Sequence, residues 1–133
     1  MPHITVEYSA NLEPDLNIRR LIDAAHDVAA RSGLFELGGI RTRAERRDHY
    51  RVADGDPTNG FIHVVIRIAP GRPLEKRKAL GEAVLATVSK ETDAIYAKRG
   101  LAISVEIQEL DAALNFKKNN LHERLAAKRG AAA

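Results

Sequence analysis

The feature that most constrains this fold is a strict alternation of aliphatic residues in three short segments. The clearest is Phe61–Ala69, in which every second residue is aliphatic. One face of this segment consists of Ile62, Val64, Ile66 and Ile68. Segments 3–8 and 101–107 alternate in the same way. Alternation with a period of two predicts β-strands that bury one face against another layer of the protein.

Helical patterns follow two of these strands. Leu16–Ser32 carries an apolar stripe with helical spacing and ends before Gly33, and a second helix is predicted from Leu74 to about Arg99. Glu91 falls on the apolar stripe of this second helix, and the sequence offers no reason for it. A further strand is predicted at Ile40–Arg43, before a charged connection that reaches the turn at 54–57.

The order is therefore strand, helix, strand, repeated once. Each βαβ unit implies a parallel pair of strands, and the length of 133 residues suits one domain. The sequence predicts an α/β fold of the two-layer α+β type, with a duplicated βαβ unit and a four-stranded sheet that has two helices on one face. The expected halves are residues 2–53 and 61–110, followed by a C-terminal arm, 111–126, and a frayed tail, 127–133.

The second face of this sheet has a mixed composition, with Thr5, Val65, Arg67, Ser104 and Glu106. It is too polar for a dry core and too apolar for open water, and parallel strands are seldom left bare on one side. We therefore expect other subunits to cover this face.

Composition excludes several classes of protein. The chain has no cysteine, and no apolar run approaches the roughly 20 residues of a membrane span. Charged residues occur throughout the first 30 residues, so we expect a cytoplasmic protein with no membrane partner. The sequence contains no phosphate-binding glycine loop, and its five histidines are not spaced as metal ligands usually are. We therefore expect neither a cofactor nor a metal.

The net charge of +3 is compatible with either nucleic acid or a small anion. A possible phosphate-binding stripe consists of Arg41, Arg43, Arg46, Arg47 and Arg51. Glu45 and Asp48 interrupt it, and no aromatic pair offers a platform for bases, so we expect no nucleic-acid partner.

Three residues are candidates for catalysis. Pro2 follows the initiator methionine, and removal of Met1 would leave a secondary amine that can exchange a proton near neutral pH. Arg41 and Arg72 lie at junctions between helices and strands, where a guanidinium can hold a carboxylate with two hydrogen bonds. His3 and His63 could share a sheet face near Pro2, but the sequence assigns them no role.

These residues resemble the tautomerase superfamily, and within it the branch of 5-carboxymethyl-2-hydroxymuconate Δ-isomerases. The resemblance covers nearly the whole chain in order. The matching stretches are Pro2-His3, Val6-Glu7, Asn11, Gly39-Ile40-Arg41-x-Arg43, Ala53-Asp54-Gly55, Phe61-x-His63, Gly71-Arg72-x-Leu74-Glu75 and Leu114-Asn115-Phe116-Lys117-x-Asn119-Asn120. Pro73 departs from the pattern, because related sequences often have Ser or Thr at this position.

The resemblance implies a homotrimer that isomerises a dienol polycarboxylate without a cofactor in homoprotocatechuate degradation. It also implies that Pro2 is the acid/base, and that Arg41 and Arg72 bind carboxylates and stabilise the dienolate. Two alternatives stay open. A related tautomerase could act on another enol or keto acid, and a non-enzymatic trimeric binding module would need neither a free proline amine nor clustered arginines.

Overall fold

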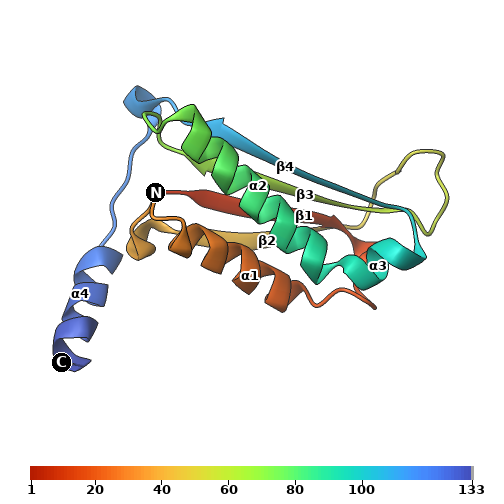
Figure 1. Cartoon of the computed structure of the whole chain (residues 1–133), viewed down its shortest axis with the longest axis horizontal. Coiled ribbons are helices and arrows are strands. Elements are labelled where there is room, and N and C mark those ends of the chain that lie inside the picture. Colours follow the sequence, from red (N-terminus) through yellow and green to blue (C-terminus); the bar gives the residue numbers. More distant parts are fainter. Residues whose placement is uncertain (133) are drawn as a thin grey trace.

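The computed structural model describes residues 1–132 and contains one four-stranded sheet in the order β2-β1-β3-β4 (Figure 1). The strands are β1 (His3–Ser9), β2 (Arg41–Arg47), β3 (Gly60–Ile68) and β4 (Leu101–Glu109). The α-helices are α1 (Ile18–Arg31), α2 (Leu74–Glu91), α3 (Asp93–Lys98) and α4 (Leu121–Ala132). Three short 3-10 turns complete the fold: η1 (Ala10–Leu12), η2 (Leu37–Gly39) and η3 (Ala112–Leu114).

The sheet is mixed. The outer pairs β1–β2 and β3–β4 are parallel, as the two βαβ units predict, whereas the central strands β1 and β3 run antiparallel. In this register His3 lies opposite Arg41 on one side and Arg67 on the other. The start of β1, the start of β2 and the end of β3 therefore meet at one end of the sheet.

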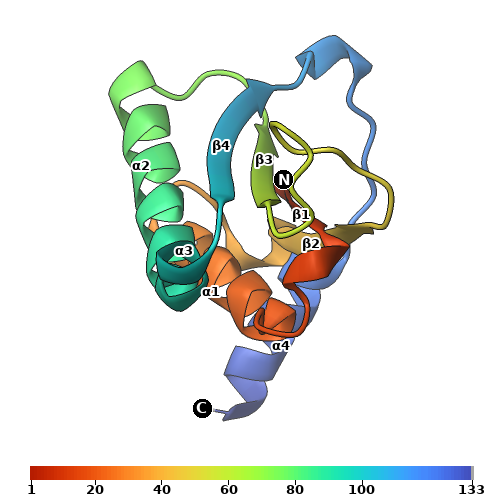
Figure 2. The same ribbon diagram turned by 90° about the vertical axis from the view of Figure 1, so that its right-hand side faces the viewer.

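Both long helices lie on the same face of the sheet, which confirms the two-layer prediction (Figures 1 and 2). The aliphatic faces of the central strands are fully buried beneath them, including Ile4 and Val6 of β1 and the four predicted residues of β3. Helix α1 begins where the Asn17 side chain accepts a hydrogen bond from the Arg20 amide, and this capping ends the loop before it.

The helices differ from the prediction in one respect. The segment predicted as one helix to about Arg99 is divided at Thr92, whose buried hydroxyl donates to the Val88 carbonyl at 2.7 Å and so closes the end of α2. The unexplained Glu91 pairs with Arg20 of α1 at 2.8 Å. Its place on the inner stripe thus reflects an ion pair between the two helices.

Two further segments differ from their predicted bounds or conformation. Strand β2 reaches Arg47 rather than Arg43, because all seven of its residues pair with β1 despite their charge. Residues 127–132, predicted as part of a frayed tail, belong to helix α4, and the last residue of that tail, Ala133, lies outside the described residues. Figure 1 shows α4 projecting from the sheet, near the end that carries the N-terminus. None of the helices in residues 1–132 is both long and apolar enough for a transmembrane span.

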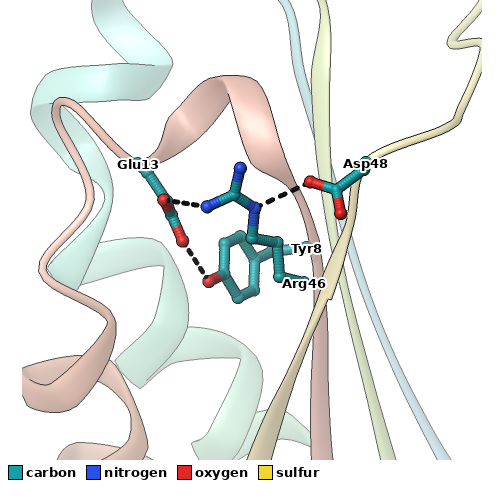
Figure 3. A network of polar contacts seen from close by, with 4 residues as sticks. All are labelled: Tyr8, Glu13, Arg46 and Asp48. Carbon is teal, nitrogen blue, oxygen red and sulfur yellow. Dashed lines mark hydrogen bonds and ion pairs between the residues drawn. The ribbon is translucent and has the colours of Figure 1, made fainter.

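Part of the arginine stripe has a structural explanation. Arg46 bonds to Glu13 at 2.7 Å and to Asp48 at 2.9 Å, and Tyr8 donates to the other oxygen of Glu13 at 2.7 Å (Figure 3). Arg47 pairs in turn with Glu7 at 2.7 Å. These guanidinium groups are already occupied by carboxylates of the same chain, whereas a phosphate-binding surface would leave them free.

Candidate functional site

The candidate site lies at the sheet end where β1 begins. Pro2 is buried, and its carbonyl accepts a hydrogen bond from the Arg41 amide at 3.2 Å. The main chain of Arg41 is therefore fixed directly beside the N-terminus. Strand pairing, which local sequence cannot specify, is what joins these two residues.

Arg41 has no partner for most of its guanidinium. Its Nε and Nη2 atoms are buried and form no hydrogen bond. Buried polar groups are almost always paired, and an unmade hydrogen bond costs about 1–3 kcal/mol. An arginine in this state is arranged to receive an acceptor from outside the chain, and a carboxylate fits its geometry.

Arg72 reaches the same region from the turn between β3 and α2. Its Nη2 donates to the Leu34 carbonyl at 3.0 Å and its Nη1 to the Ala69 carbonyl at 3.1 Å, while the guanidinium stacks on the Phe35 ring at 4.7 Å from its centroid. The turn itself depends on Gly71, whose φ of +111° few other residues adopt. Arg72 is thus held in one position, yet it keeps its positive charge.

The C-terminal arm supplies the remaining wall. Asn119 donates a hydrogen bond to the Gly38 carbonyl at 2.9 Å, and its Nδ2 lies 3.8 Å from the Met1 sulfur. Helix α4 begins so close to η2 that a Cβ atom on Gly38 would lie 2.9 Å from the His122 backbone nitrogen. His122 also pairs with Glu36 at 3.0 Å. A residue other than glycine at position 38 would push the arm away from the N-terminus.

The electrostatics of the amino terminus reflect this arrangement. Burial lowers the pKa of the Met1 amine below its ordinary value, and the positive charges of Lys117, Arg72 and Arg41 lower it further, in that order. Among residues 1–132, no carboxylate lies within ion-pair distance of any of these three side chains. The amine of Met1 is therefore subject to three positive charges, none of which forms an ion pair within residues 1–132.

The structure brings together all three residues predicted for the site, and it separates the two histidines. His3 lies near the amine, and its pKa is lowered by burial and by the charges of Arg41, Arg43 and Arg67. His63 shares the same sheet face but lies further along it, opposite Glu7, where it bonds to Ser104 at 2.5 Å and Glu106 at 3.0 Å. Within residues 1–132, no cluster of three or more His, Asp or Glu side chains could hold a metal ion.

Comparison with known proteins decides the family. A sequence profile of 5-carboxymethyl-2-hydroxymuconate isomerase matches residues 2–125. The chain belongs to this isomerase family. The 5-carboxymethyl-2-hydroxymuconate Δ-isomerase of Escherichia coli is 37% identical over 122 residues, which cover 92% of this chain and 97% of that protein.

Solved structures agree with this assignment. A 5-carboxymethyl-2-hydroxymuconate isomerase from Deinococcus radiodurans R1 superposes with a TM-score of 0.88 at 40% identity, covering 93% of both chains. A macrophage migration inhibitory factor-like protein from Entamoeba histolytica has a TM-score of 0.62 at 11% identity, covering 88% of this chain and 95% of that one. The second match shows the shared fold alone, and the predicted resemblance to 5-carboxymethyl-2-hydroxymuconate isomerases is confirmed.

Sequence reasoning assigned no role to two residues that the structure places here. Lys117 and Asn119 were recognised only as part of the C-terminal stretch that resembles the family. Their signal was an irregular, polar segment after the last strand, which local patterns cannot place against an N-terminus more than 100 residues away.

Proposed function

We propose that this isomerase converts the dienol 5-carboxymethyl-2-hydroxymuconate to its unsaturated ketone, 5-oxopent-3-ene-1,2,5-tricarboxylate, in homoprotocatechuate degradation. The observation that carries the proposal is the pair of buried, unpartnered guanidinium nitrogens of Arg41, Nε and Nη2, beside the N-terminus. A cationic site of this kind suits a substrate with several carboxylates, because a monocarboxylate would leave part of the positive charge of the site unmatched.

Pro2 acts as the acid/base in this proposal. While Met1 is present, the Pro2 nitrogen is a tertiary amide and has no basicity. Met1 also fills the space beside Gly39, since a Cβ atom added to Gly39 would lie 3.3 Å from the Met1 Cγ atom. Removal of Met1 frees a secondary amine next to the cations that already lower the pKa of the amino terminus. A lowered pKa favours the neutral form of this amine, which is the form that a base requires.

The reaction then needs only proton transfers. The Pro2 nitrogen takes the proton of the dienol hydroxyl, and the electron pair moves through the conjugated system. A proton carried by the same nitrogen is delivered to the carbon at the far end of the diene. Negative charge develops on the dienolate oxygen, where Arg41 has unused donors to meet it. Arg72, fixed by carbonyls, binds a carboxylate in both ground and transition states.

A homotrimer is the second part of the proposal. Within residues 1–132 no helix covers the second face of the sheet (Figure 2), yet Thr5, Val65 and His63 on this face are only partly exposed. Large apolar side chains of the arm are strongly exposed, with Leu114 at 72% and Phe116 at 85%. Contacts between subunits would bury both surfaces, since exposed apolar groups of this size usually mark an interface.

The test pairs intact mass with decay of the dienol absorbance. Protein that begins at Pro2 is expected to be active, and protein that retains Met1 to be inactive. Pro2→Ala in Met1-free protein should lower kcat about 10²- to 10⁴-fold, the usual contribution of a positioned base. The control is Pro14→Ala, because Pro14 is exposed in a loop away from the amine. Full activity of the Met1-bearing form would refute the proline mechanism.

A further inference from the structure

We infer that Lys117 binds the carboxymethyl carboxylate of the substrate and so determines which dienols this enzyme prefers. The inference rests on the proposed function, and it concerns a residue of the C-terminal arm that lies outside the two βαβ units. Arg41 and Arg72 then bind the two carboxylates at the ends of the conjugated chain.

The position of Lys117 follows from the arm. Two residues further on, Asn119 is fixed to the Gly38 carbonyl at 2.9 Å and touches Met1, so this part of the arm lies against the N-terminus. Figure 1 shows the segment between η3 and α4 passing the end of the sheet that carries the N-terminus. Of the positive charges acting on the amine, that of Lys117 has the largest effect.

The charge of Lys117 is free to bind a ligand. The side chain forms no ion pair among residues 1–132, in contrast to Arg46 and Arg47, which are paired with carboxylates. Three cations from three separate elements, none of which forms an ion pair within residues 1–132, thus lower the pKa of one amine, and the proposed substrate carries three carboxylates. A site for a dicarboxylate would need only two of them.

The chemistry of the side chains assigns the third carboxylate to Lys117. The end carboxylates are conjugated with the diene and planar with it, which suits the rigid fork of arginine. The carboxymethyl group rotates about its CH₂ bond. A lysine ammonium on a flexible stem can follow this rotation, because it binds as a point charge without a fixed plane.

The experiment compares two dienols in Met1-free protein: 5-carboxymethyl-2-hydroxymuconate and 2-hydroxymuconate, which lacks the carboxymethyl group. Lys117→Met is expected to lower kcat/KM for the tricarboxylate about 10- to 100-fold, mainly through KM, and to change the value for the dicarboxylate less than about threefold. Lys117→Arg should restore most of the loss. Lys118→Met is the matched control, because Lys118 is the adjacent exposed lysine.

A second measurement needs no substrate. Titration of the Pro2 amine by NMR should show a higher pKa in Lys117→Met than in wild type, and no change in Lys118→Met. Equal losses on both dienols, or an amine pKa unaffected by Lys117→Met, would overturn the inference. If wild-type protein turns over neither dienol, it is the proposed function that fails.

Discussion

Replacing Arg41 with methionine should make the protein more stable and much less active. Methionine keeps an unbranched stem of similar length but removes the charge. In the structure Nε and Nη2 of Arg41 are buried without a partner, and an unmade buried hydrogen bond costs about 1–3 kcal/mol. The two atoms belong to one group and share its desolvation, so we take the value for one group: Arg41→Met should raise the free energy of unfolding by about 1–3 kcal/mol.

The loss of activity follows from the same two atoms. If they bind the dienolate, their removal should cost about 2–4 kcal/mol in kcat/KM, or roughly 30- to 1,000-fold, with kcat falling as well as KM rising. The assays are urea unfolding at a fixed protein concentration and decay of the dienol absorbance. A gain in stability with a loss of activity is a combination that ordinary core damage does not produce.

Arg43→Met provides the control. Arg43 lies two residues along the same strand and the same face and is exposed. Within residues 1–132, its side chain forms one hydrogen bond, to the His3 ring at 3.2 Å. Its replacement should change the free energy of unfolding by less than about 0.5 kcal/mol. If Arg41→Met is instead destabilised, the guanidinium has a partner in the folded protein, and the argument from its unmade hydrogen bonds is refuted.

Three other predictions follow from the structure. Arg72→Ala should mainly raise KM, and Arg72→Lys should restore KM only partly. Arg72→Ala should also destabilise the fold by about 1–2 kcal/mol, because the hydrogen bonds to the Leu34 and Ala69 carbonyls are lost. A lowered kcat with unchanged KM would contradict this prediction. Burial and the hydrogen bond to Glu13 raise the pKa of Tyr8 to about 12. The contribution of the protonated hydroxyl to stability should therefore be lost between about pH 10 and 12. The free energy of unfolding of Tyr8→Phe should lack this dependence on alkaline pH. Light scattering at micromolar concentration should give about three times the 14.6 kDa of one chain, and an active monomer would exclude the proposed trimer.

Periodicity in the sequence determined the elements and the face that each one buries. The four aliphatic residues of Phe61–Ala69 are buried under the helices, because alternation along a strand fixes which side chains share a face. The strand–helix–strand order likewise determined the two parallel pairs, since a crossover helix returns the chain to the same direction. Periodicity did not determine where the elements end. Pairing with β1 extends β2 through charged residues that the sequence predicted as a connection.

Only the tertiary structure decided how the two halves meet. No local pattern specifies that β1 and β3 pair antiparallel, yet this pairing brings Arg41, at the start of one strand, to the same end of the sheet as Arg72, beyond the end of another. The same holds for the arm, whose contact between Asn119 and Gly38 joins residues 81 positions apart. Local sequence sets the conformation of each segment, but the contacts that assemble this site form between segments, and their energy arises only when the whole sheet has folded.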